Sequence, residues 1–433
     1  MSRITSTGSG PLEGVARIPG DKSISHRAVI FGAIATGETQ ITNLLDGEDV
    51  LCTISCFREM GLEITGPDEG RLQICGVGLK GLTAPKRTLR TGNSGTTMRL
   101  LTGLLVGQQF GCTLAGDQSL QRRPMTRVID PLVQMGAHVD GTEGRPPLTI
   151  QPVKALHTIC YEMPVVSAQV KSAILLAGLY ASGVTQVVES MPTRDHSERM
   201  LCAFAGKEWR PGGIIQVEGG ACLRGQQVTV PGDISSAAFF LVGASICPGS
   251  DLLLTDVGVN PTRVAVLEIL KMMGANIELS NSRVKSGEPV CDIRVRTASL
   301  QAIDVPIAYV ASAIDEFPVL AIAAAAAQGT TRIRGAQELR IKESDRIRAV
   351  VTGLQALGVI AVEYPDGMDI TGGPFQSGIV DSLGDHRIAM AFAIAGARAE
   401  GPVVIDDCDN IGTSFPGFLR LANTLGLSLS EHP

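Results

Sequence analysis

The sequence predicts an α/β protein of two domains, each an inside-out barrel with buried helices at its centre and with sheets and amphipathic helices outside. Two observations carry this prediction. A unit with two helices recurs six times along the 433 residues. Nearly the same short sequence motif opens the first and the fourth copies, since 18–23 reads IPGDKS and 230–235 reads VPGDIS. The six units therefore form two sets of three.

Glycines mark the expected helix ends. Glycine adopts the left-handed conformation that commonly terminates a helix. We expect the first helix of each unit to stop at Gly37, Gly107, Gly183, Gly249, Gly329 and Gly401. We expect the second helix of each unit to stop at Gly61, Gly136, Gly206, Gly274, Gly358 and Gly426.

The two helices of a unit differ in their apolar pattern. The first is apolar nearly all round, as in 174–181 and 321–327, which is typical of a helix buried on every side. The second has a one-sided apolar stripe, as in Ile347, Val350 and Leu354. Helices inside and strands outside are the reverse of a TIM barrel, which would also need parallel strands between all its helices, a pattern we do not find here.

The Pro-Gly turns at 19–20 and 231–232 are the predicted crossing points between domains. The first domain is expected to span 21–231. The second is expected to span 232–433 together with 1–20, where Leu12, Val15 and Ile18 alternate and form an added strand.

Composition excludes several classes of protein. The net charge of −6, from 37 basic and 43 acidic residues, disfavours a nucleic-acid or anionic-membrane partner, and Trp209 with four tyrosines offers no stacking platform. No uncharged apolar run reaches the length of a membrane span, and the N-terminus lacks the apolar core of a signal peptide. Ten scattered cysteines without a CxxC pair predict a reduced, cytoplasmic protein with no structural metal.

Polar clusters stand where the buried helices begin, for example Asp21–Arg27, Thr91–Thr97 and Gly384–Arg387. Ser, Asn and Asp there are partly ordinary N-caps, which is a sufficient explanation for Asp233–Ser236 in the fourth unit. Caps do not explain the cations of the first and sixth units, because a cation in the first helical turn opposes the helix dipole. An anion bound between cation and helix end would remove the conflict, and backbone N–H groups at 92–96 can donate to it. We therefore predict anion sites in units one, two and six.

Two further clusters, Gln121–Pro124 and Glu338–Arg346, precede second helices. The alternative interpretation of Glu338–Arg346 is a solvent-exposed helix start that carries many charged side chains. The planar guanidinium group of arginine can donate two parallel hydrogen bonds to a carboxylate or phosphate group. The predicted cage for a small, highly charged anion consists of Lys22, Arg123, Lys342, Arg346 and Arg387. Asp315 and Glu343 are the carboxylates available for proton transfer within it.

With these residues in view, the chain resembles the 5-enolpyruvylshikimate-3-phosphate synthase family over essentially its whole length. The motifs that carry the resemblance are TGNSGTTMR at 91–99 and RIKESDRI at 340–347. The resemblance implies two domains of three βαβαββ repeats and a cleft that closes on substrate. It also implies transfer of the enolpyruvyl group of phosphoenolpyruvate to the 5-hydroxyl of shikimate 3-phosphate, by addition and then elimination of phosphate, without cofactor or metal.

The resemblance also implies which residues act. The expected contacts to shikimate 3-phosphate are Lys22, Ser23, Arg27, Ser167, Ala168, Gln169, Arg194, Asp315 and Lys342. The expected contacts to phosphoenolpyruvate are Lys22, Asn93, Gly95, Arg123, Gln169, Arg346 and Arg387. Asp315 is expected to be the base on the hydroxyl, with Glu343 and Lys22 as proton donors or shuttles.

The chain departs from some relatives at two places. Ala168 replaces a serine, so one hydroxyl contact is lost, and Thr413 stands where some relatives have a lysine that binds phosphoenolpyruvate. Gly95 matches a position at which glyphosate-resistant relatives carry alanine, so sensitivity to this herbicide is expected.

The alternative function is that of UDP-N-acetylglucosamine enolpyruvyl transferase. However, 117–121 lacks the cysteine that this enzyme carries on a mobile loop, and Lys22 is followed by serine rather than asparagine. We expect a monomer.

Overall fold

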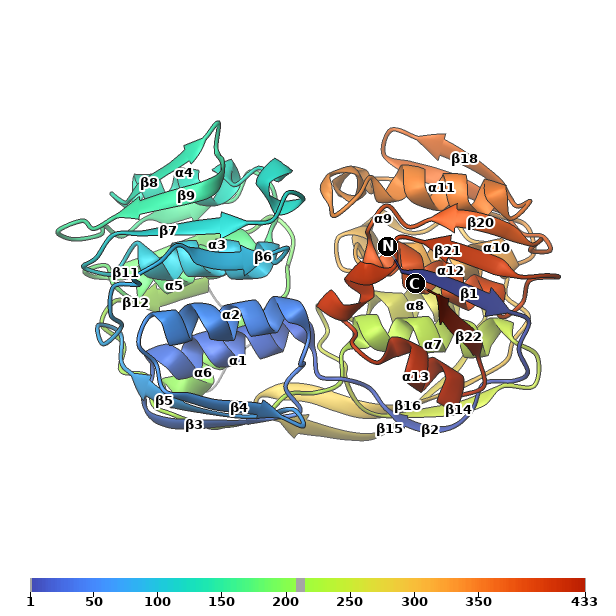
Figure 1. Cartoon of the computed structure of the whole chain (residues 1–433), viewed down its shortest axis with the longest axis horizontal. Coiled ribbons are helices and arrows are strands. Elements are labelled where there is room, and N and C mark those ends of the chain that lie inside the picture. The colour runs from blue at the N-terminus through green and yellow to red at the C-terminus, as the bar shows by residue number, and fades with distance from the viewer. Residues whose placement is uncertain (1, 208–214, 433) are drawn as a thin grey trace. The chain divides into compact units, whose positions relative to one another are not determined.

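The computed structural model describes residues 2–207 and 215–432, drawn in Figure 1. Trp209, considered above, lies outside the described residues. Contacts divide the chain into two compact units, which we treat separately. Unit 1 comprises 2–19, 231–284 and 289–432, and unit 2 comprises Gly20–Val230 and Lys285–Glu288.

Unit 2 contains six α-helices, within its described residues, and three sheets. The helices are α1 (Lys22–Ile34), α2 (Glu48–Glu59), α3 (Gly95–Leu105), α4 (Thr126–Gln134), α5 (Ala168–Gly178) and α6 (His196–Phe204). The first sheet has the order β13-β3-β5-β4, with β3 (Thr36–Thr42), β4 (Ile64–Asp68), β5 (Arg71–Val77) and β13 (Gln227–Thr229). The second has the order β6-β7-β9-β8, with β6 (Leu89–Gly92), β7 (Cys112–Gly116), β8 (His138–Thr142) and β9 (Arg145–Gln151). The third is β10-β11-β12, with β10 (Cys160–Glu162), β11 (Val184–Val188) and β12 (Ile215–Glu218).

Unit 1 repeats this plan. Its helices are α7 (Ile234–Ile246), α8 (Ala265–Met272), α9 (Ile307–Val310), α10 (Phe317–Ala326), α11 (Arg346–Ala356), α12 (His386–Gly396) and α13 (Phe418–Thr424). One sheet is β15-β16-β14-β2, with β2 (Glu13–Arg17), β14 (Asp251–Gly258), β15 (Asn276–Lys285) and β16 (Glu288–Arg296). Another is β17-β19-β18, with β17 (Thr330–Ile333), β18 (Ile360–Tyr364) and β19 (Gly367–Thr371). The last is β20-β21-β1-β22, with β1 (Arg3–Thr7), β20 (Gly378–Asp381), β21 (Val403–Asp406) and β22 (Ser428–His432).

The helices predicted to be buried form the centre of each unit. Every residue of α7 and α12 is buried, and so is α10 up to Ala325. These three helices pack on one another within a single apolar core. In unit 2, α3 and α5 pack so closely that a Cβ at Gly103 would lie 2.3 Å from the carbonyl oxygen of Ala173. Figure 1 shows the sheets outside these helices, so the inside-out arrangement is confirmed.

The glycine prediction is right for one helix series and partly wrong for the other. All six second helices are followed by a glycine in the left-handed region, from Gly61 to Gly426. In the first series, Gly107 and Gly401 have no positive φ. Gly107 is needed for space instead, because a Cβ there would lie 2.2 Å from Cγ of Tyr180. Gly37 is left-handed but lies inside β3, beyond the end of α1.

The strand expected before Pro19 is present, as β2 pairs in parallel with β14 of unit 1. The polar-looking segment Arg3–Thr7 also forms a strand, β1, which sits between β21 and β22 and was not predicted. Short parallel pairs flank several buried helices, for example β6 with β7 around α3 and β20 with β21 around α12. These pairs are only three or four residues long, and β7 and β21 also pair in the antiparallel sense with β9 and β1, so the described residues lack the parallel strands between all helices that a TIM barrel needs, as expected.

Candidate active site

The start of α1 holds Lys22 beside a carboxylate. The Asp21 carboxylate caps the helix by accepting from the Ile24 N–H at 2.9 Å. The Lys22 ammonium donates to Oδ2 of Asp49, on α2, at 3.0 Å. A protein carboxylate therefore already balances this cation, and its place at a helix start does not by itself require a bound anion. That step of the sequence argument is corrected, although Lys22 remains partly exposed.

Arg27 is buried, with 3% of its surface exposed, and joins three helices. Its guanidinium donates to Oγ of Ser197 at 2.7 Å, to Oγ of Ser172 at 2.8 Å and to the carbonyl of Ser23 at 2.9 Å. These three acceptors are neutral oxygens. Burial lowers the pKa of Arg27 to about 10, with Arg194 adding to the effect and Glu198 opposing it. The side chain remains a cation at neutral pH.

Around the start of α3, Asn93, Gly95 and Arg123 come together as the sequence suggested. The Asn93 amide donates to Oδ2 of Asp117 at 2.9 Å and accepts from the Arg123 guanidinium at 2.8 Å. A Cβ built on Gly95 would lie 3.5 Å from Nη1 of Arg123 and 2.6 Å from Nη1 of Arg99. Two guanidinium groups therefore border Gly95.

One part of the predicted anion site at 92–96 is corrected. The Ser94 N–H donates to the Thr91 carbonyl at 3.0 Å, so it is not available to an anion. The Ser94 hydroxyl caps α3, accepting from the Thr97 N–H at 3.1 Å.

Ser167, Ala168 and Gln169 open α5. The Ser167 hydroxyl is the cap, with the Val170 N–H at 3.4 Å. The Gln169 amide accepts from Arg99 at 2.8 Å and donates to Oγ1 of Thr96 at 3.0 Å, which fastens α5 to the first turn of α3. Arg99 was quoted in the sequence motif but given no role. Its position four residues after Gly95 on one helix could have identified it.

A buried chain of polar groups connects α1, α2 and α3. Nδ1 of His26 lies 2.7 Å from Oγ1 of Thr53, which lies 2.7 Å from Oγ1 of Thr97, and Thr97 donates to Oγ of Ser94 at 2.8 Å. The Thr97 hydroxyl has a second acceptor in the Asp49 carbonyl, at 3.3 Å. Because Thr97 directs its single proton to Ser94 or to this carbonyl, Thr53 must donate to Thr97 and accept from His26. The network therefore assigns the proton to Nδ1 of His26. Burial, then Lys22 and Arg27, lowers the pKa of His26 well below its usual value, so the ring stays neutral.

In unit 1, the five predicted residues gather around Arg346 and Asp315. Arg346 begins α11 and donates to Oε2 of Glu343 at 2.7 Å and to Oδ1 of Asp315 at 3.4 Å. The Lys342 ammonium lies 3.3 Å from Oδ1 of Asp315. The Arg387 guanidinium donates to the backbone carbonyl of Asp315 at 3.0 Å.

Asp385 completes this cluster, although the sequence suggested only a cap. It does cap α12, accepting from the Arg387 N–H at 2.9 Å, and it also accepts from Nε of Arg346 at 2.8 Å. Burial by itself would raise the pKa of Asp385, but the Arg346 charge lowers it below the usual range. Burial would likewise lower the pKa of Arg346, and Asp385 and Glu343 together raise it instead.

The fourth unit differs from the others in how its helix start is closed. Asp233 caps α7 as predicted, with the Ser235 N–H at 2.8 Å. The buried Arg263 guanidinium donates to Oγ of Ser235 at 2.7 Å and lies 3.9 Å from Glu316. A protein cation therefore occupies this helix start, which the sequence described as a cap without a cation.

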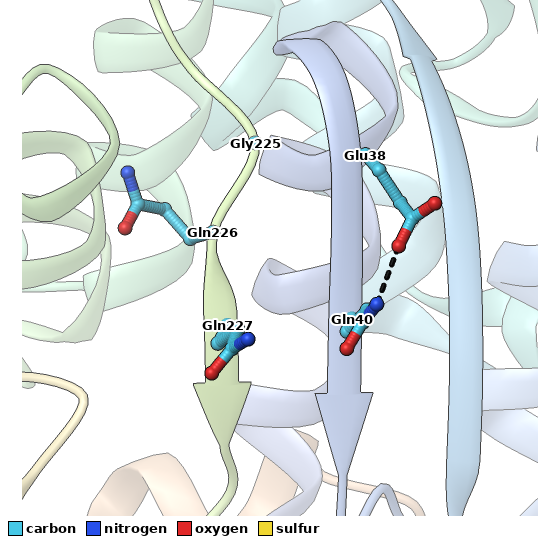
Figure 2. Close-up of a pocket in the computed structure, with 5 residues that line it drawn as sticks. All are labelled: Glu38, Gln40, Gly225, Gln226 and Gln227. Carbon is cyan, nitrogen blue, oxygen red and sulfur yellow. Dashed lines mark hydrogen bonds between the residues drawn. The ribbon is translucent and has the colours of Figure 1, made fainter.

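A surface cavity of about 390 Å³ lies apart from these residues, in unit 2, lined by Glu38, Gln40, Gly225, Gln226 and Gln227. Figure 2 shows the Gln40 amide donating to the Glu38 carboxylate along β3. None of the predicted site residues lines this cavity, so it is not the candidate active site.

Within the described residues, no group of three or more His, Cys, Asp or Glu side chains is placed to hold a metal ion. Among the same residues, every helix is too short or too polar to cross a bilayer.

The fold and the cations around Gly95 and Asp315 define a class of protein, an α/β protein whose cationic side chains suit small anionic ligands. The family model described as EPSP synthase (3-phosphoshikimate 1-carboxyvinyltransferase) matches residues 6–421. The 3-phosphoshikimate 1-carboxyvinyltransferase of Alkalilimnicola ehrlichii is 57% identical over 98% of this chain and 95% of its own. That of Nitrosococcus oceani is 56% identical over 97% of this chain and 95% of its own. The solved structure of EPSP synthase from Acinetobacter baumannii covers 100% of both chains with a TM-score of 0.90 and 47% identity.

The chain belongs to the EPSP synthase family. The inside-out α/β fold of its two units is the fold of that family.

Proposed function

We infer that the protein transfers the enolpyruvyl group of phosphoenolpyruvate to the 5-hydroxyl of shikimate 3-phosphate and releases phosphate. The reaction belongs to the shikimate pathway of aromatic amino-acid biosynthesis. Family membership over residues 6–421 supports this function. The alternative, UDP-N-acetylglucosamine enolpyruvyl transferase, is not favoured, since the family model and the relatives above carry the 3-phosphoshikimate 1-carboxyvinyltransferase name.

The single observation that carries the proposed chemistry is the position of Asp315 and Glu343 among cations. Asp315 lies within 3.4 Å of both Lys342 and Arg346, and Glu343 lies 2.7 Å from Arg346. Carboxylates held this way can exchange a proton with a substrate while the cations stabilise charge that develops on its phosphate and carboxylate.

The proton transfers follow from the bonds that change. A proton is added to the methylene carbon of phosphoenolpyruvate while the sugar-like hydroxyl attacks the neighbouring carbon and loses its own proton. The resulting tetrahedral adduct then loses a methyl proton and phosphate, which restores the double bond. We propose Asp315 as the base on the hydroxyl, and Glu343 with Lys22 as the groups that deliver and recover the proton at carbon.

The remaining predicted residues are proposed as substrate ligands. Those for shikimate 3-phosphate are Lys22, Ser23, Arg27, Ser167, Ala168, Gln169, Arg194, Asp315 and Lys342. Those for phosphoenolpyruvate are Lys22, Asn93, Gly95, Arg123, Gln169, Arg346 and Arg387. The Arg27 guanidinium donates its hydrogen bonds to three neutral oxygens, and this supports a role for Arg27 in binding a substrate phosphate.

The proposed ligands are divided between the two units, so both must reach the same substrates. The cations of one set would repel those of the other, and an anion that binds both sets would favour a closed state by differential binding. We expect the radius of gyration in solution to fall when shikimate 3-phosphate is added with an inhibitor. An unchanged radius at saturation would argue against closure from an open form.

The function itself is tested by release of phosphate from phosphoenolpyruvate. Shikimate 3-phosphate should support rapid release and UDP-N-acetylglucosamine should not. The opposite preference would establish the alternative enzyme.

We further propose a cytoplasmic monomer that works without a metal or organic cofactor, because the reaction needs only acid, base and positive charge. Sedimentation would test the monomer, and undiminished activity after exhaustive chelation would test the absence of a metal.

A further inference from the structure

Lys171 is a buried cation that the proposed reaction does not use. It lies in the first turn of α5 with no exposed surface. Its ammonium is 2.7 Å from Oε1 of Glu198 and 3.2 Å from the carboxylate of Glu189, and both carboxylates are themselves nearly buried. A charge this deep in a protein is retained only where it is paired. Here one ammonium pairs with two carboxylates from different segments.

Glu189 holds the segment that leads to Arg194. Its carboxylate accepts from the Thr193 N–H at 3.1 Å and from the Thr193 hydroxyl at 2.7 Å. β11 ends at Val188 and α6 begins at His196, so residues 189–195 have no regular strand or helix to hold their backbone. Their conformation depends on side-chain contacts, and Glu189 makes two to Thr193 and one to Lys171.

Glu198 holds the other end of the same segment. It lies on α6 next to Ser197, whose hydroxyl binds the Arg27 guanidinium at 2.7 Å. Burial raises the pKa of Glu198, and Lys171 opposes this effect. Because Glu198 is also a counter-charge for Arg27, an ionised Glu198 helps to keep Arg27 charged. Lys171 thus contacts carboxylates on both sides of Arg194.

We propose that Lys171 is a positioning residue for shikimate 3-phosphate. It clamps residues 189–198 against α5 from both ends, and so sets Arg194 and Arg27 for the substrate phosphate without touching the substrate. This inference rests on the proposed function, specifically on the roles of Arg194 and Arg27 as ligands of shikimate 3-phosphate. The Asn93 amide, from a proposed phosphoenolpyruvate ligand, bonds to Asp117 and Arg123, which lie outside this clamp.

The first experiment compares Lys171→Met with Lys171→Arg and measures KM for each substrate and kcat. Since small misplacements of a binding group are costly, Lys171→Met should raise KM for shikimate 3-phosphate at least about tenfold. KM for phosphoenolpyruvate should stay within about twofold, because a change in KM for one substrate alone marks lost binding of that substrate. Lys171→Arg should recover most of the loss. Equal effects on both substrates, or no effect on either, would overturn the positioning role.

In Lys171→Met, Glu189 and Glu198 lose the cation between them, and the variant could fold poorly for that reason alone. Two further variants test the same role without this problem. Lys171→Met/Glu198→Gln removes one buried negative charge together with the positive one. Glu189→Gln loosens the Thr193 end alone while the Lys171–Glu198 pair remains. Both should raise KM for shikimate 3-phosphate selectively, and Lys154→Met, at an exposed lysine of the same unit, should not.

A double-mutant cycle with Arg194→Gln separates this inference from the function on which it rests. Residues that act through one another have non-additive effects. If Lys171 acts through Arg194 as well as Arg27, then Lys171→Met should raise KM for shikimate 3-phosphate clearly less in Arg194→Gln than in the wild type. If the two losses multiply in full, the proposed action of Lys171 through Arg194 is wrong although the site is right. If Arg194→Gln leaves KM for shikimate 3-phosphate unchanged, the proposed substrate site is wrong instead.

Discussion

Arg346 and Asp385 form a buried ion pair in unit 1, with Nε of Arg346 2.8 Å from Oδ2 of Asp385 and side-chain exposures of 1% and 0%. Removing one partner of such a pair leaves an uncompensated charge in a dry environment. The pair joins the first turn of α11 to the cap of α12, so it also sets where Arg346 can meet a substrate. Its contribution to stability should be measurable and dependent on pH.

We expect Asp385→Asn to destabilise the protein by about 3–5 kcal/mol at neutral pH, the usual cost of breaking a buried pair. Asparagine still caps a helix, so the charge is tested alone. Because folding lowers the pKa of Asp385, the stabilisation is present above the unfolded pKa of about 3.9 and is lost as pH falls toward the folded value. The difference in urea unfolding free energy between the two proteins should therefore shrink below about pH 4.

Asp304→Asn is the matched control, since Asp304 pairs with Arg332 at 3.1 Å on the surface, with side-chain exposures of 73% and 55%. Its effect should stay below about 1 kcal/mol. A difference for Asp385→Asn that is the same at pH 3 and pH 7 would show that charge is not the cause.

Glu343→Gln and Asp315→Asn should each lower kcat at least about a hundredfold while leaving the protein folded, because a lost general acid or base costs about that much. Rapid-quench measurement of a single turnover would show the loss in chemistry rather than in product release. Glu431→Gln, at an exposed position of β22, should keep normal turnover. Near-normal turnover in either of the first two variants would remove its assigned role.

Glyphosate should inhibit the wild-type protein, and Gly95→Ala should weaken glyphosate by at least about tenfold, an energy of about 1.4 kcal/mol. The new Cβ would lie 2.6 Å from Nη1 of Arg99, which must shift and disturb its bond to Gln169. The longer ligand should suffer more than phosphoenolpyruvate. Competition kinetics measure both affinities. Equal losses for the two ligands would refute the steric explanation, and a resistant wild type would refute the expected sensitivity.

His26 should remain neutral, with its proton on Nδ1, even at pH 6.5, because burial lowers its pKa well below that usual value. The ¹⁵N chemical shifts of the two ring nitrogens report both properties. In Thr97→Val the Thr53 hydroxyl loses its acceptor, but Nε2 of His26 has no hydrogen-bond partner among the described residues, so the proton should stay on Nδ1. Thr97→Ser keeps the chain and should keep the tautomer. A wild-type ring protonated on Nε2 would contradict the assigned network.

Much of the fold was predictable because it depends on local patterns. A helix that is apolar all round, such as α7 or α10, has no face that tolerates water, so its burial follows from composition alone. The left-handed glycines after the second helices follow from backbone sterics in the same way. β1 was missed because Ile4 is its only apolar side chain; the sheet that flanks it, rather than its own sequence, makes it a strand.

The sequence by itself determined which residues gather at the helix starts and which family they resemble. Only the tertiary structure decided how those charges are balanced. Asp49 reaches Lys22 from another helix, Arg263 closes the start of α7, and Lys171 pairs with two carboxylates that follow it in the chain. The physical reason is that capping and helix burial act over one or two turns, whereas ion pairing acts through space between segments that only folding brings together.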